Sequence, residues 1–174
     1  MVCDYIGMQP LDWLIVAPRH IDLDNVPSEL AAISSHHNIV PDPPLEGYVT
    51  SMDIAHAVAR TRCDVFSWST HQANGALQLS DGHTLDADTA AEYVRASSAR
   101  LCIFNVCLGR QFEERVAYLC DCDVIYSPVA VDDEVAATYM AQLAAALVEY
   151  DDFYEAYQAV GSHGGEYKYI RAKD

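Results

Sequence analysis

Four short, largely apolar runs separated by segments with helix signals constrain the fold of this chain most strongly. The runs span residues 11–17, 64–69, 100–106 and 124–126. Runs of this length that are apolar at successive positions are typical of strands covered on both faces, as in a parallel sheet. The sequence therefore predicts an α/β fold, a three-layer sandwich with a mostly parallel central sheet flanked by helices.

The segments between these runs carry helix and turn signals. Helices are expected over residues 24–35, 51–62, 86–97, 112–120, 132–147 and 152–160. Capping residues, acidic first turns and apolar positions at helical spacing support them. A short strand is expected at 36–40, a proline-rich loop at 41–47, and a hairpin around the Asp81-Gly82 pair.

The length of 174 residues suits one compact domain. We expect an N-terminal extension at 1–10, a single α/β domain at 11–160 and a C-terminal tail at 161–174. Glycines at 161, 164 and 165 set the tail apart.

The chain is strongly acidic, with 10 Lys and Arg against 26 Asp and Glu and a formal net charge of −16. Such a field repels phosphate backbones and anionic lipid headgroups, which argues against nucleic acid and membrane surfaces as partners. The sequence contains no apolar run of membrane-spanning length and no basic cluster at its amino terminus. A cytoplasmic location is therefore expected.

The cysteines and short motifs exclude several kinds of site. The six cysteines form no CxxC pair, and a chain of this size does not need a disulfide framework, so reduced thiols are expected. Cys120-Asp121-Cys122 and His36-His37 lack the usual spacing of zinc ligands. Neither GxGxxG nor GxxxxGK[ST] occurs. We expect no metal and no organic cofactor.

Chemistry-bearing residues follow three of the predicted strands. His71 follows the third strand, Cys107 ends the fourth, and Asp132 and Asp133 follow the fifth. Ligands of open parallel sheets bind outside the carboxyl ends of the strands, so these residues are expected at one rim. A cysteine nucleophile needs a neighbouring base, which a histidine provides. Each residue also has an ordinary structural interpretation. Cys107 can be a buried thiol and His71 a loop residue, and the two acids can be helix caps.

Several runs together resemble the caspase-like clan of cysteine peptidases (clan CD), and within it the bacterial CHAT domains related to separase. The resemblance covers about residues 11–160 in order. The runs that carry it are residues 64–71, 75–82, 101–107, 116–119, 124–126 and 131–136.

This resemblance implies a caspase-like sandwich that hydrolyses peptide bonds through His71 and Cys107. The oxyanion hole would be formed by backbone N–H groups of Cys107 and of the loop starting at Gln72, a position where the family usually has glycine. Asp133, with Asp132 beside it, falls where the family's branch with basic specificity places the acid that binds arginine. The resemblance further implies a protein or peptide substrate, a regulatory protein partner, and a role in bacterial defence or programmed death.

Two other classes of function stay open. The first is a catalytically inactive caspase-like module that serves as a scaffold or binding domain. The second is a small-molecule-binding α/β domain in which His71 and Cys107 are incidental. Faster alkylation of Cys107 than of the other five cysteines would separate an enzyme from both, because a catalytic thiolate is exposed and has a lowered pKa.

Overall fold

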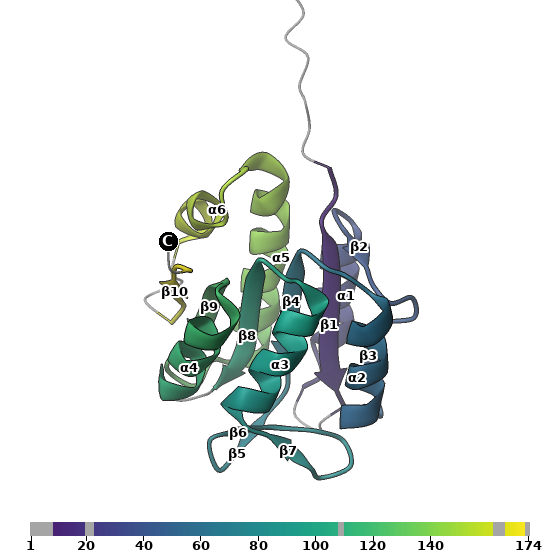
Figure 1. Cartoon of the computed structure of the whole chain (residues 1–174). Coiled ribbons are helices and arrows are strands. Elements are labelled where there is room, and N and C mark those ends of the chain that lie inside the picture. Colours follow the sequence, from purple (N-terminus) through teal and green to yellow (C-terminus); the bar gives the residue numbers. More distant parts are fainter. Residues whose placement is uncertain (1–8, 20–22, 108–109, 162–165, 173–174) are drawn as a thin grey trace, which may run out of the picture.

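The computed structural model describes residues 9–19, 23–107, 110–161 and 166–172. In this part of the chain a seven-stranded sheet forms the centre of the molecule (Figure 1). Its strands are β1 (Asp12–Pro18), β2 (Asn38–Ile39), β3 (Leu45–Gly47), β4 (Val65–Ser69), β8 (Leu101–Cys107), β9 (Asp123–Ser127) and β10 (Lys168–Ile170). The order is β10-β9-β8-β4-β1-β2, and β3 pairs with the carboxyl half of β1. All of these pairings are parallel except that of β10 with β9.

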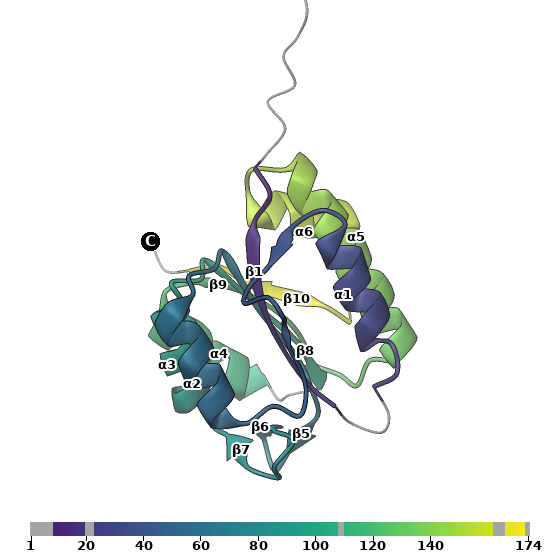
Figure 2. The same cartoon turned by 90° about the vertical axis from the view of Figure 1, so that its right-hand side faces the viewer.

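Helices cover both faces of this sheet (Figure 2). One layer consists of α1 (Val26–Ser34), α5 (Asp133–Glu149) and α6 (Phe153–Val160). The other consists of α2 (Ser51–Arg60), α3 (Ala87–Ser97) and α4 (Arg110–Cys120). The predicted three-layer α/β sandwich with a mostly parallel sheet is confirmed.

Two apolar cores, one on each face, explain why the strands are apolar at successive positions. In β8, Leu101 and Ile103 belong to the core under α1 and α5, whereas Cys102 and Phe104 belong to the core under α2, α3 and α4. Since successive side chains of a strand point to opposite faces, both sets must be apolar.

A small three-stranded sheet follows β4 directly. It consists of β5 (Gln72–Ala73), β6 (Ala76–Gln78) and β7 (Thr84–Leu85). The pairing of Leu77 with Leu85 confirms the predicted hairpin around Asp81-Gly82. A second, unpredicted hairpin joins β5 to β6 through Asn74 and Gly75, whose φ angles of 55° and 75° are those of a type I′ turn.

The segment expected as a loop at residues 41–47 contains a strand. Leu45–Gly47 pairs in parallel with Val16–Pro18. The pairing begins just after Pro44, the last of three prolines, so that residues 45–47 retain the N–H groups that proline lacks.

The sheet also continues beyond residue 160, where the sequence analysis ended the domain. Residues 168–170 form β10, an antiparallel edge strand on β9. Before it, Tyr167 is fully buried and stacks on Tyr139 of α5, with ring centroids 3.7 Å apart. Burial of this aromatic ring explains why the end of the chain is held against the sheet. Of the expected N-terminal extension, residues 1–8 lie outside the described residues.

Candidate active site

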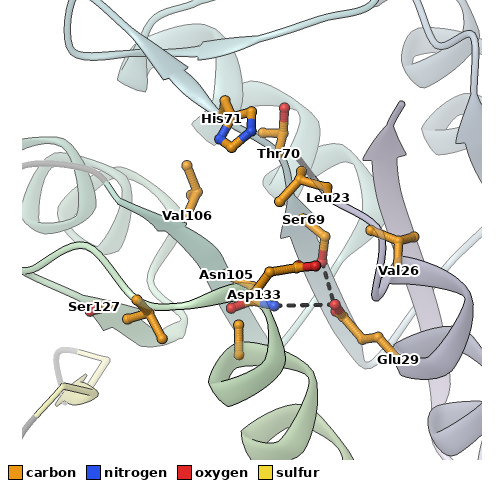
Figure 3. A pocket seen from close by; sticks show the side chains of 12 residues that line it. Leu23, Val26, Glu29, Ser69, Thr70, His71, Asn105, Val106, Ser127 and Asp133 are labelled. Atoms are coloured by element: carbon orange, nitrogen blue, oxygen red, sulfur yellow. Dashed lines mark hydrogen bonds between the residues drawn. The ribbon is translucent and has the colours of Figure 1, made fainter. Parts of the chain in front are cut away.

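A small cavity of about 110 Å³ opens at the carboxyl ends of β4, β8 and β9 (Figure 3). Its polar wall comes from α1, these three strand ends and the start of α5. The polar side chains used below are Glu29, Ser69, His71, Asn105, Ser127 and Asp133. The cavity therefore lies where parallel α/β sheets bind their ligands.

The structure brings the predicted dyad to neighbouring strand ends. β4 and β8 are adjacent and parallel, and their last matched pair is Ser69 with Asn105. His71 lies two residues beyond Ser69 and lines the cavity. Cys107 lies two residues beyond Asn105 and is the last residue of β8, with its backbone opposite Ser127. The Cys107 side chain lies outside the described residues.

A bulge interrupts β8 just before Cys107. Phe104 pairs with Tyr126 and Cys107 with Ser127, so two residues of β8 have no counterpart on β9. Bulges bend a strand and redirect the side chains that follow, and they are frequent beside active sites. Val106, which lies in this bulge, both packs into the core and lines the cavity.

Gln72, a predicted oxyanion donor, is exposed and lies opposite Leu77 in the β5–β6 ladder. Next to it, the His71 carbonyl accepts a hydrogen bond of 2.9 Å from the Gln78 N–H. Because bonded and non-bonded pairs alternate in an antiparallel ladder, the Gln72 N–H is directed away from β6. The Gln72 side chain accepts the N–H of Gly75 at 3.1 Å and thereby closes the turn.

The two predicted substrate-binding acids have different surroundings. Asp132 is exposed and caps α5, with its carboxylate accepting the Glu134 N–H at 3.0 Å. Asp133 lines the cavity, and its Oδ2 accepts the backbone N–H and the side-chain amide of Asn25 at 2.9 and 2.8 Å. Asp133 thus joins the amino ends of α1 and α5, and of the two acids it is the one placed to reach a ligand.

A buried carboxyl group in the cavity wall was missed by the sequence analysis. Glu29 of α1 is 3% exposed. Its Oε1 accepts a hydrogen bond from Ser69 Oγ at 2.7 Å and its Oε2 accepts one from Asn105 Nδ2 at 3.1 Å (Figure 3). A sequence signal existed, since Glu29 lies on the helical stripe of Val26, Leu30 and Ile33, and a charge on an apolar stripe is unusual.

Burial raises the pKa of Glu29 to about 7. The hydrogen bonds from Ser69 and Asn105 favour the ionised form and oppose this shift, while the negative charge of Asp133 adds to it. Near neutral pH the cavity wall therefore contains a carboxyl group that exchanges a proton.

Tyr167 completes this polar cluster from the far end of the chain. Its hydroxyl donates to Asn105 Oδ1 at 2.8 Å. That bond fixes the orientation of the Asn105 amide, so that the Nδ2 group faces Glu29.

The other described cysteines lie away from the cavity. Burial raises the pKa of the Cys63 thiol to about 11 and moves that of Cys102 well above its usual range. Cys122 is buried, and its pKa is raised by the hydrogen bond with Cys120 and by burial. Cys120 is only partly buried, and the same bond lowers its pKa. Cys120 is therefore the most reactive of these four thiols.

Among the described residues, no group of three or more His, Cys, Asp and Glu side chains is arranged to hold a metal ion. Within the same ranges, none of the helices has both the length and the apolar character needed to cross a bilayer.

No protein-family model matches the sequence, and no curated protein matches it.

Proposed function

We propose that this chain is a cysteine endopeptidase that acts through His71 and Cys107. The observation that carries the proposal is the placement of these two residues. His71 lies two positions after Ser69 and Cys107 two positions after Asn105, and Ser69 and Asn105 are a matched pair at the edge of the sheet where the cavity opens. The parallel sheet with helices on both faces is the architecture expected of the caspase-like clan that the sequence resembles. Action in the cytoplasm, control by a protein partner and a role in bacterial defence or programmed death belong to the same proposal.

The reaction begins when the Cys107 thiolate attacks the carbonyl carbon of the scissile bond. A C–S bond forms, and His71 protonates the leaving amine as the C–N bond breaks. His71 then takes a proton from water as the water oxygen attacks the thioester, so that the C–S bond breaks, the acid product leaves and the Cys107 thiolate is restored. The oxyanion would be held by the N–H groups of Cys107 and Gln72, and a donor of this kind contributes about 3 kcal/mol. The outward direction of the Gln72 N–H supports that role.

The proposed residue before the cleaved bond is arginine, bound by Asp133. Both hydrogen bonds from Asn25 go to Asp133 Oδ2, so Oδ1 accepts no hydrogen bond from the described residues. A guanidinium group bonds such a carboxylate through its fixed set of donors, which lysine matches less well. Glu29 in the same wall and the net charge of −16 also favour a cation.

The test is cleavage of peptide libraries by the wild type, Cys107→Ala and His71→Ala. Each substitution should abolish turnover, and the double variant should be no worse than either single one, because the two residues act as a unit. Arginine before the cut should be preferred over lysine and strongly over aspartate. Normal cleavage by Cys107→Ala would refute the mechanism, and a preference for aspartate would refute the role of Asp133 alone.

The inactive scaffold is the second candidate, and Gln72 favours it. This residue stands where the family usually has glycine, and its side chain is engaged with Gly75. Iodoacetamide labelling near neutral pH distinguishes the two candidates. In a Cys120→Ser background, which removes the most reactive of the other described thiols, an enzyme should show rapid labelling of Cys107. A scaffold should label slowly at every cysteine.

A further inference from the structure

Glu29 connects the two strands that carry the proposed catalytic residues. Its two carboxylate oxygens accept hydrogen bonds from different strands, one from Ser69 of β4 and one from Asn105 of β8. Ser69 and Asn105 are direct cross-strand neighbours. The carboxylate therefore bridges a single matched pair, and that pair is the last one before the two strands separate.

Beyond this bridge β4 and β8 no longer pair with each other, although Cys107 still pairs with Ser127 of β9. β4 ends at Ser69, and β8 enters its bulge after Phe104. His71 and Cys107 both follow these points. Ser69 and Asn105, the partners of Glu29, are thus the last residues at which β4 and β8 are held directly to each other before His71 and Cys107.

The bridge is itself held rigidly. Glu29 is 3% exposed and Ser69 is equally buried, so water does not compete effectively for their hydrogen bond. Tyr167 holds the Asn105 amide from its other side at 2.8 Å. Burial of Glu29 and Ser69 and the hydrogen bond from Tyr167 to Asn105 thus restrain the partners of this bridge.

We infer that Glu29 is a positioning residue. It holds the ends of β4 and β8 at the spacing that lets His71 act as the acid–base partner of Cys107. The inference rests on the proposed peptidase function. Glu29 acts through Ser69 and Asn105 and does not itself transfer a proton to substrate. Small errors in such spacing are costly, since a displacement of about 1 Å can lower a rate about 100-fold.

Three variants test the bridge by steady-state cleavage of an arginine peptide. Glu29→Met keeps the size and removes both acceptors, and Asn105→Asp sets two carboxyl groups against each other. Each should lower kcat between about 10-fold and about 100-fold, with KM changed less than about 3-fold. The double variant Glu29→Gln with Asn105→Asp again pairs an amide with a carboxylate, and its kcat should return to within about 3-fold of the wild type.

The matched control is Glu113→Met. Glu113 is also fully buried, but it lies on α4 at the opposite face of the sheet, and its carboxyl oxygens have no hydrogen-bond partner among the described residues. Its replacement should leave kcat unchanged. A kcat within about 2-fold of the wild type for Glu29→Met, or no recovery in the double variant, would overturn the inference.

Hydrogen exchange separates this inference from the proposed function. If the wild type shows no cleavage that depends on Cys107, the peptidase proposal fails. The bridge is then judged by amide exchange in residues 69–71 and 105–107, which should be faster in Glu29→Met and Asn105→Asp and restored in the double variant. Exchange that stays at the wild-type rate in these segments would overturn the bridge.

Discussion

Glu113 should make the stability of this protein fall as the pH rises. Its side chain is fully buried on α4, and neither carboxyl oxygen has a hydrogen-bond partner among the described residues. Burial raises its pKa from 4.5 to about 7. The folded protein therefore prefers the neutral acid, whereas the unfolded chain ionises freely.

The sign and size of the effect follow from this difference in pKa. Between about pH 4.5 and about pH 7 the folded state holds a proton that the unfolded state has lost, so the free energy of unfolding falls as the pH rises and levels off above 7. The full loss is about 3 kcal/mol, of which about 2 kcal/mol falls between about pH 5.5 and about pH 8. Glu113→Met removes the titrating group and keeps a similar volume, so the variant should gain about 2 kcal/mol relative to the wild type across that interval.

Urea unfolding at several pH values measures this gain. Trp13 and Trp68 are both fully buried and report unfolding by fluorescence, and working above the sequence pI of about 4.5 keeps the protein soluble. Glu149→Met, at an exposed position at the end of α5, is the control and should leave the pH dependence unchanged. If the difference between Glu113→Met and the wild type stays constant within about 0.5 kcal/mol, the reasoning from burial is wrong.

Three further predictions concern single side chains. Cys102→Ala should cost about 1 kcal/mol in urea unfolding through a small cavity in the core, and turnover should be spared; loss of turnover in the folded variant would mean that the wrong thiol was assigned as nucleophile. Among Cys63, Cys102, Cys120 and Cys122, iodoacetamide should modify Cys120 first and Cys63 far more slowly, as peptide mass spectrometry would show. Equal rates would contradict a lowered pKa for Cys120 and a raised pKa for Cys63. Asp133→Ala should erase the preference for arginine, and it should lower the free energy of unfolding by about 1 kcal/mol because both donors of Asn25 lose their acceptor. An unchanged cleavage profile would mean that Asp133 only joins α1 to α5.

The elements that the sequence predicted correctly are those with local signals. The helix expected over residues 86–97 begins with a capping side chain, since the Asp86 carboxylate accepts the Thr89 N–H at 2.8 Å. The apolar runs identified the long strands because burial on both faces leaves a continuous pattern. β3, β5 and β10 were missed because strands of two or three residues carry too little pattern, and their pairing depends on a partner placed by the rest of the fold.

The candidate site likewise contains residues that local sequence signals predicted and one that only tertiary packing places there. The rule that ligands bind at carboxyl strand ends was enough to place His71 and Asp133, and both line the cavity. In the sequence, Glu29 is only an acidic residue in the first turn of the helix expected over residues 24–35. Its burial, and its bonds to Ser69 and Asn105, arise from packing between segments 40 and 76 residues away in sequence, which periodicity does not record.

The hydrogen bond from Tyr167 to Asn105 also gives the molecule an order of assembly during synthesis. The polar cluster under the rim takes Glu29, Ser69, Asn105 and Tyr167 from points spread along nearly the whole chain. Contacts between distant segments form slowly because the entropy of loop closure opposes them, and a chain in synthesis still lacks its later segments. Until residue 167 has been added, the amide of Asn105 lacks the hydroxyl that orients it. The rim becomes complete only after residue 167 has been added, so a partly synthesised chain cannot yet have the finished site.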